Sequence, residues 1–286
     1  MEIDSDIIIV GGGLNGSLLA IAAAKIGFST IVLDSKGNHR DELNSFDGRS
    51  YALAASSVRL LKNLDIFEDI RGCSQPILDI EILDGKLVQG PSQFSLHFDN
   101  NEIHDGPMGY MVEDRFIQKT LFAQILATNR IDYKFDSKVT EHYQQGGYIS
   151  VLLDHGQKLR TRLVVGADGR NSNTAKRAKI KKSGWRYKQN ALVCAIEHEI
   201  DHKGLAWQYF LPSGPLAILP MTGNRSSIVW TEQTRNANAI NALDDNQYME
   251  ILDSRLGSFL GKSKLIGSRH LFPLELRIAK RGRGRR

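Results

Sequence analysis

Cysteine is scarce in this chain. Only two cysteines, Cys73 and Cys194, occur in 286 residues, and they are far apart and in no metal-type spacing. A disulfide framework and a zinc site are therefore excluded as the basis of the fold. Such cysteine usage fits a reducing compartment, and we expect a cytoplasmic protein.

The features of a secretory signal and of a membrane span are also missing. Glu2, Asp4 and Asp6 stand where the basic region of a signal peptide would lie, so we expect no signal peptide. The apolar stretch 7–24 is interrupted by glycines and by polar Asn15 and Ser17, which argues against a transmembrane helix.

An excess of positive charge exists only at the carboxyl-terminus. The net charge of +5 equals the charge of five basic residues, which are Lys280, Arg281, Arg283, Arg285 and Arg286. Of the 37 basic residues these five leave 32, which balances the 32 acidic residues. The basic balance therefore belongs to a short Arg/Gly tail, for which an unstructured end is the simplest interpretation. We expect no nucleic-acid partner.

The first 34 residues have the pattern of a βαβ unit. Residues 7–10 form a short apolar β-branched run, residues 16–26 are rich in Ala and Leu, and residues 29–34 read "STIVLD". The order strand, helix, strand predicts a parallel sheet with a right-handed crossover. We predict further helices at 51–64 and 114–128, with Asp114 as the helix N-cap.

The middle of the chain changes to antiparallel patterns. Alternation predicts a strand at 77–83, polar turn residues follow to 107, and three antiparallel strands are expected at 138–143, 148–154 and 158–165. A buried strand at 163–170 comes next. After residue 183 we predict strands at 191–200, 206–211, 215–219 and 226–231, with one helix at 245–256.

A glycine motif directly follows the first strand. Residues 11–16 read Gly-Gly-Gly-Leu-Asn-Gly and match the G-x-G-x-x-G pattern of dinucleotide-binding loops. Gly11 permits the tight turn, Gly13 lets the backbone approach a pyrophosphate at the helix amino-terminus, and Gly16 lets helix and strand pack closely. Asp34 ends the second strand, where a carboxylate can accept hydrogen bonds from ribose hydroxyls. The motif alone leaves NAD and FAD open.

A second motif, "VVGADGRNS" at 164–172, is by itself a common strand end. Its position, after an antiparallel excursion, makes the whole order specific. The glycine motif, Asp34, "GRSYALAASSVRLL" at 48–61, "MVEDRFIQKTL" at 111–121 and "VVGADGRNS" together resemble the class A FAD-dependent aromatic hydroxylases, the para-hydroxybenzoate hydroxylase type. Within that class the chain most resembles the ubiquinone-biosynthesis hydroxylases of the 2-octaprenyl-6-methoxyphenol hydroxylase type, with "GPLAILP" at 214–220 as a further matching phrase.

The resemblance implies an α/β fold, with a Rossmann-like domain for FAD and NAD(P)H and a second, sheet-dominated substrate domain. The implied boundaries are residues 1–76 and 108–182 for the FAD-binding domain, 77–107 and 183–272 for the substrate domain, and 273–286 for a return segment and tail. The implied cofactor contacts are Gly11, Gly12, Gly13, Leu14, Gly16, Asp34, Arg49, Arg115, Asp168 and Gly169. Solvated surface charge is the alternative for Arg49 and Arg115.

The resemblance further implies a FAD-dependent monooxygenase that hydroxylates a polyprenylated phenol with NAD(P)H and O2. Because the cofactor supplies the reactivity, we name no catalytic acid or base. Association with the inner membrane face or with a ubiquinone-biosynthesis complex would follow from such a substrate. Trp207, Tyr209, Phe210, Leu219 and Trp230 are candidates to line an apolar pocket, with ordinary core as the alternative.

One departure from the family is visible. After "FPLELRIAKR" the family continues to a Gly-Asp motif that contacts the flavin, whereas this chain reads Gly282-Arg283-Gly284-Arg285-Arg286. On the resemblance we expect a carboxy-terminal truncation and weak FAD binding by the chain as given. A hydroxylase of another aromatic substrate and an inactive fragment remain the alternatives.

Overall fold

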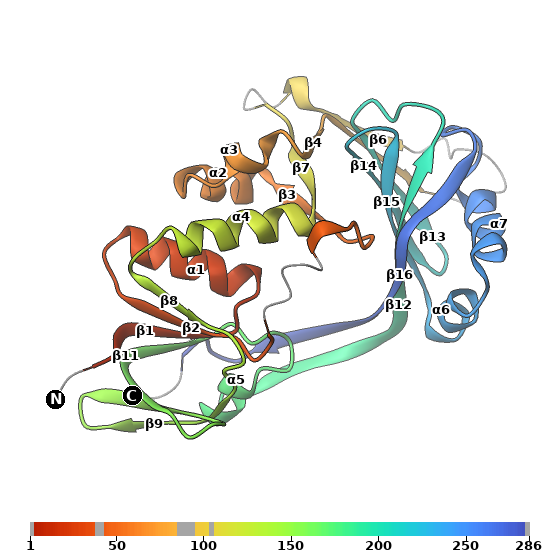
Figure 1. The fold of residues 1–286 in the computed structure, drawn as a ribbon. Helices are drawn as coiled ribbons and strands as arrows, with labels where there is room; N and C mark the ends of the chain where they lie inside the picture. Colours follow the sequence, from red (N-terminus) through yellow and green to blue (C-terminus); the bar gives the residue numbers. More distant parts are fainter. Residues whose placement is uncertain (1–2, 38–42, 85–94, 103–105, 284–286) are drawn as a thin grey trace. The chain divides into compact units, whose positions relative to one another are not determined.

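In the computed structural model, the described residues are 3–37, 43–84, 95–102 and 106–283 (Figure 1). They form two compact units, each assembled from separate parts of the chain. The first unit comprises residues 1–44, 118–185 and 277–286, and the second comprises 45–117 and 186–276. These units are defined by compactness alone, so the domain boundaries expected from the sequence remain predictions.

The first unit is built on a mixed six-stranded sheet. Its strands lie in the order β8 (Ile131–Lys134), β2 (Thr30–Leu33), β1 (Ser5–Val10), β11 (Lys158–Gly166), β10 (Tyr148–Leu153) and β9 (Val139–Gln145). The strands β8, β2, β1 and β11 are parallel to one another, whereas β10 and β9 are antiparallel. The predicted parallel start and antiparallel excursion are both present.

Apolar side chains leave both faces of β1. Ile9 packs with Ala20 of helix α1 (Leu14–Lys25) and with Val32, while Ile8 packs on the opposite face with Val151 of β10 and Leu159 of β11. A strand whose two faces are both covered has to be apolar throughout, which explains the run at 7–10.

The long strand β11 corrects one expectation. Residues 158–165 and 163–170 were expected as two strands, but one strand covers 158–166 and residues 167–170 follow it outside the sheet. Thr161 is paired with Ile149 on the antiparallel side and with Ser5 on the parallel side. The antiparallel excursion is therefore an extension of the parallel sheet.

The second unit contains two sheets. A seven-stranded sheet has the order β16 (Ser263–Ala279), β12 (Lys182–His198), β15 (Arg225–Gln233), β14 (Gly214–Met221), β13 (Leu205–Leu211), β5 (Asp79–Asp84) and β6 (Ser95–Asp99). A three-stranded sheet has the order β3 (Ser50–Ala54), β7 (Gly109–Glu113) and β4 (Ser74–Ile77). The α/β class with a second, sheet-dominated part is confirmed.

The helices of the second unit cover one face of the large sheet. Helix α6 (Thr234–Asn241) and helix α7 (Asp245–Leu256) contribute Ala237, Tyr248 and Leu252 to a core that contains Trp230 and Ile218. Helices α2 (Ala55–Asn63) and α3 (Phe67–Arg71), the short 3-10 helix η3 (Asn100–Glu102) and the amino-terminal turn of α4 (Asp114–Leu126) complete the second unit. Helix α5 (Asn173–Arg177) belongs to the first unit.

Three predicted elements were wrong in part. The helix expected at 51–64 is strand β3 followed by α2, because residues 50–54 pair with β7. The strand expected at 77–83 is split at Leu78, whose N–H donates to the carbonyl of Gly204, so β4 and β5 belong to different sheets. The polar stretch before residue 107 contains β6, while residues 85–94 and 103–105 lie outside the described part.

Candidate cofactor site

The glycine loop lies where the first strand ends and α1 begins. Gly11 has φ +106°, and a Cβ there would lie 2.5 Å from the carbonyl oxygen of Ala167, at the end of β11. A Cβ at Gly16 would lie 1.9 Å from the carbonyl oxygen of Gly11, which fixes the close packing of helix and strand. The expected turn at Gly11 and the expected contact at Gly16 are therefore present.

Gly13 differs from its neighbours because its surroundings are open. A Cβ at Gly13 would meet no described atom within 4 Å, and the residue is exposed at the N-cap of α1. No side chain of the described residues caps this helix, and its first turn, which begins at Leu14, holds no acidic residue. A helix amino-terminus with a clear approach and no carboxylate of its own suits an anion such as pyrophosphate.

Gly12 faces the opposite way, toward the protein. A Cβ there would lie 1.8 Å from the Tyr133 hydroxyl oxygen and 2.6 Å from Oδ2 of Asp34. Gly12 was predicted as a cofactor contact, but its missing side chain makes room for Tyr133 and Asp34. Its effect on a ligand would therefore come through the shape of the loop.

Asp34 directly follows β2, as predicted. Its Oδ2 accepts a hydrogen bond from the Tyr133 hydroxyl at 2.9 Å, and its Oδ1 accepts one from the N–H of Lys36 at 3.0 Å. Each carboxylate oxygen can accept two hydrogen bonds. The carboxylate therefore keeps capacity for two ribose hydroxyls, as a nucleotide site requires.

Asp168 lies beside the loop, but its carboxylate points into its own segment. The Ser172 hydroxyl donates to Oδ1, and the N–H and hydroxyl of Thr174 both donate to Oδ2 at 3.0 Å. Burial acts to raise the pKa of Asp168, but these hydrogen bonds outweigh it and lower the pKa. Ser172 in turn caps α5 by accepting from the N–H of Ala175.

Asp168 therefore shapes the turn, and any contact with a cofactor is made most readily by the neighbouring backbone. Gly169 is exposed with φ +77°, and its carbonyl accepts from the N–H of Ser172 at 3.1 Å. The side-chain role expected for Asp168 at the cofactor remains a prediction.

In the second unit, Arg49 is a paired charge. Its Nε donates to Asp47 at 2.6 Å and its Nη2 lies 3.0 Å from Oδ2 of Asp114, whose side chain is 2% exposed. Burial, followed by the negative charge and hydrogen bond of Asp114, raises the pKa of Tyr51 to about 12. The Arg49 side chain is 43% exposed, so it is held in place by its two partners and still reaches solvent.

The loop that carries Arg49 is pressed against β16. A Cβ at Gly48, which has φ +95°, would lie 2.6 Å from the carbonyl oxygen of Ser268, and the N–H of Ser268 donates to Asp47. His270 also hydrogen-bonds the Asp47 carbonyl at 2.9 Å. The turn is therefore held against β16 by backbone contacts with Ser268 and by the side chain of His270.

Arg115 belongs to a second ionic cluster of the same unit. Its Nε lies 2.7 Å from Oε2 of the buried Glu113, whose Oε1 lies 2.8 Å from Arg225. Both arginines also approach the ring of Phe46. Arg115 is engaged with the fold, which weakens the case for a cofactor contact, and that contact remains a prediction.

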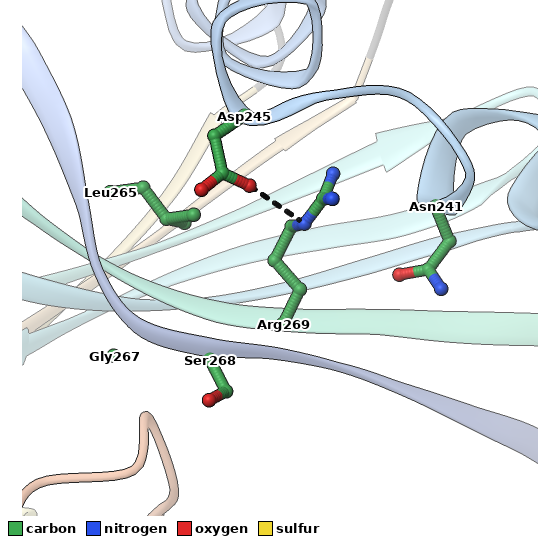
Figure 2. A pocket seen from close by; sticks show the side chains of 6 residues that line it. All are labelled: Asn241, Asp245, Leu265, Gly267, Ser268 and Arg269. Atoms are coloured by element: carbon green, nitrogen blue, oxygen red, sulfur yellow. Dashed lines mark ion pairs between the residues drawn. The ribbon is translucent and has the colours of Figure 1, made fainter.

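A pocket of about 310 Å³ occurs elsewhere in the second unit (Figure 2). Arg269 crosses it, forms an ion pair with Asp245 at 3.3 Å, donates to the carbonyl of Leu243 and lies over the ring of Tyr248. The charge of Arg269 is therefore used by the fold, and none of the predicted site residues lines this pocket.

The structure brings Gly11, Gly12, Asp34 and the backbone next to Asp168 together in one unit. Arg49 and Arg115 lie in the other unit, so their convergence with the glycine loop remains a prediction. The sequence reasoning missed Tyr133, Glu113 and Arg225, and it treated Asp114 only as a helix cap. An acidic pair before an arginine at 113–115 was a visible signal, whereas Tyr133 had none.

Comparison with known proteins agrees with this geometry. Residues 4–284 match the model of a family described as FAD binding domain. The chain belongs to the FAD-binding family of class A monooxygenases. Members of this class use FAD and take electrons from NAD(P)H, and the open glycine loop and Asp34 fit the adenosine diphosphate half of FAD.

Among the relatives of this chain, ubiquinone hydroxylase UbiL of Rhodospirillum rubrum is 39% identical over 277 residues. The match covers 97% of this chain and 63% of that protein. The 3-demethoxyubiquinol 3-hydroxylase of Escherichia coli is 28% identical, with 90% of this chain and 65% of that protein covered. The chain thus spans less than two thirds of the length of these relatives.

Solved structures agree on the fold. The p-nitrophenol 4-monooxygenase of Pseudomonas putida matches with a TM-score of 0.77 at 17% identity, over 99% of this chain and 72% of that one. Aklavinone-11 hydroxylase in complex with FAD and aklavinone matches with a TM-score of 0.75 at 17% identity, over 99% of this chain and 56% of that one. Among the described residues, no helix has both the length and the hydropathy needed to cross a bilayer.

Proposed function

We propose that this chain is part of a flavin hydroxylase that acts on an aromatic precursor of ubiquinone. The observation that carries the proposal is the open amino-terminus of α1 beside Asp34, in a chain that is 39% identical to a ubiquinone hydroxylase. FAD, when bound, accepts electrons from NAD(P)H and activates O2 for transfer to an electron-rich ring.

The residues of this chain would bind and orient the partners of that reaction. We propose that Gly13 and Leu14 present backbone N–H groups to the pyrophosphate, and that Asp34 accepts from the ribose. Arg49 would offer its exposed guanidinium edge to a flavin phosphate or ring oxygen, because Asp47 and Asp114 hold its other edge.

We propose that the substrate lies on the face of the large sheet that α6 and α7 do not cover. Trp207, Tyr209 and Trp230 pack in or against the core under those helices, so they belong to the core alternative. Phe210 lies on the opposite side of β13 from Trp207 and Tyr209 and is 50% exposed, and Phe98 of β6 is 44% exposed. Another part of this face is covered, because Ala206 and Ile80 pack with Ile77 and Met111 of the three-stranded sheet. The exposed apolar side chains of Phe210 and Phe98 suit a phenol with an apolar chain.

A polyprenylated substrate partitions into lipid, so we propose that the protein works at a membrane surface. Flotation of the purified chain with phospholipid vesicles, with and without a polyprenyl phenol, tests this point. Association that the phenol increases is expected, and a protein that stays unbound under both conditions would contradict it.

The reaction is tested by assaying the purified protein with NAD(P)H, 18O2 and FAD in large excess, because weak FAD binding is expected of the chain as given. A demethoxyubiquinol analogue and p-nitrophenol serve as alternative substrates. We expect one 18O atom in the hydroxylated quinol and no turnover of p-nitrophenol. Labelled product from p-nitrophenol alone would reject the ubiquinone assignment while retaining the monooxygenase.

A further inference from the structure

Tyr133 occupies a junction of the nucleotide site to which no role has been assigned. It lies on the edge strand β8, and its hydroxyl donates to Oδ2 of Asp34 at 2.9 Å. The same hydroxyl lies 3.3 Å from the carbonyl oxygen of Gly12, which also accepts from the Ser17 hydroxyl at 2.9 Å. One phenol oxygen therefore contacts both the ribose acceptor and the glycine loop.

The Tyr133 ring is fixed by its neighbours. Phe135 lies 4.7 Å away between ring centroids, and Phe122 lies 5.8 Å away in an edge-to-face arrangement. The backbone is fixed as well, since the N–H of Asp34 donates to the carbonyl of Lys134 at 2.9 Å. A phenol held in this way returns its hydroxyl to the same place, which is what positioning of a carboxylate requires.

The Tyr133 hydroxyl acts as a donor at all physiological pH values. Burial, followed by the negative charge of Asp34, raises its pKa, so the proton stays on the phenol. A phenol that donates to Oδ2 selects one rotamer of Asp34, and the N–H of Lys36 on Oδ1 supports the same rotamer. The remaining lone pairs then have a defined direction.

We propose that Tyr133 is a positioning residue of the nucleotide site, which orients the Asp34 carboxylate toward the two ribose hydroxyls of an adenosine diphosphate group. This role rests on the proposed FAD site. The ligand contact is made by Asp34, and Tyr133 acts through that carboxylate.

The test compares Tyr133→Phe with the wild-type chain by calorimetric titration of ADP. We expect about three- to tenfold weaker ADP binding, because Asp34 loses a charge-assisted hydrogen bond that sets its rotamer. Tyr143→Phe is the matched control, since Tyr143 is an exposed tyrosine of β9 in the same unit. Among the described residues, its ring lies under the Lys158 ammonium group and does not contact the nucleotide site. This control should bind ADP like the wild type.

Titration with 2′,3′-dideoxy-ADP separates positioning from a general structural effect. This probe has no ribose hydroxyls to donate to Asp34, so the orientation of the carboxylate should not matter. Tyr133→Phe should therefore bind the probe as the wild type does. In a double-mutant cycle, Tyr133→Phe should add nothing to the loss caused by Asp34→Asn.

Equal ADP affinity in Tyr133→Phe and wild type would overturn the positioning role. Equal weakening of ADP and dideoxy-ADP binding would also overturn it, because a loss without dependence on the hydroxyls is a loss of fold. A wild-type chain that binds no ADP would overturn the cofactor site itself, and the role of Tyr133 with it.

Discussion

The strands on either side of β1 both lead directly into a segment with an aspartate, and the two aspartates do different work. Asp34 follows β2 and holds two hydrogen bonds, one on each oxygen. Asp168 follows β11 by one residue and holds three, all from the six residues that come after it. A position at the end of a strand therefore does not by itself make an aspartate a ligand-binding residue. The carboxylate must also have lone pairs that the protein leaves unused.

The largest expected effect comes from the glycine loop, where Gly12 faces the protein and Gly13 faces open space. Gly12→Ala should lower the free energy of unfolding by about 3 kcal/mol, because its Cβ would overlap the Tyr133 hydroxyl. Gly13→Ala should lower it by less than about 1 kcal/mol, because the space around Gly13 is open. Urea denaturation of both variants measures the difference. Equal losses would show that the loop is not divided into a protein-facing and a ligand-facing glycine.

A matched pair of substitutions tests the two aspartates for stability. Asp168→Asn should cost about 2 kcal/mol, since an amide cannot accept on both sides and Thr174 then keeps unpaired donors. Asp34→Asn should cost under about 1 kcal/mol, because the amide oxygen can still accept from Tyr133 and the exposed N–H of Lys36 can donate to water instead. Thermal or urea unfolding measures both losses of unfolding free energy. A larger loss in Asp34→Asn would show that Asp34, rather than Asp168, is the aspartate on which the fold depends.

The same pair should exchange its order when binding is measured. Asp34→Asn should weaken ADP binding by about tenfold, or about 1.4 kcal/mol, because a neutral amide accepts more weakly from ribose hydroxyls. Asp168→Asn, studied where it remains folded, should bind within about threefold of the wild type. A large loss of ADP affinity in Asp168→Asn with little loss in Asp34→Asn would place the ribose contact at the end of β11 and contradict the role proposed for Asp34.

The smallest expected effect is a pH dependence near the segment that Asp168 organises. His142 hydrogen-bonds the carbonyl of Thr174 at 3.3 Å, and burial lowers the pKa of this imidazole. The unfolded chain therefore binds the proton more readily, so stability is full above the ordinary histidine pKa and declines as pH falls through the folded value.

The measurement is the free energy of unfolding between pH 7.5 and pH 5 for the wild type and for His142→Gln. The variant should show a shallower decline. A remainder is expected, because burial also lowers the pKa of His198 in the other unit. If the free energy of unfolding changed with pH in the same way in both proteins, His142 would not contribute to the pH dependence.

Much of the first unit could be predicted because its signals are local. The apolar run at 7–10, the glycines and Asp34 lie within one βαβ unit, and period and turn chemistry determine their positions. Tyr133 could not be predicted in this way. It meets Asp34 only because β8 pairs with β2, and this pairing joins segments about 100 residues apart.

Elements that depend on distant pairing were also missed. Residues 50–54 are rich in alanine, which favours helix, but their pairing with β7 makes them a strand. The commitment of Asp168 to Ser172 and Thr174 could not be separated from a ligand role by its residue type. Only the direction of the side chain distinguishes the two.

The place of β1 in its sheet has a consequence for how the protein is made. Its two neighbours are β2, which follows after a single helix, and β11, where Ser5 meets Thr161. At a translation rate of roughly 5–20 residues per second, the first strand waits about 8–30 s for its second partner to be synthesised. During that interval one edge of β1, whose residues 7–10 are all apolar, has no partner strand, so the nascent chain presents an open edge to other chains.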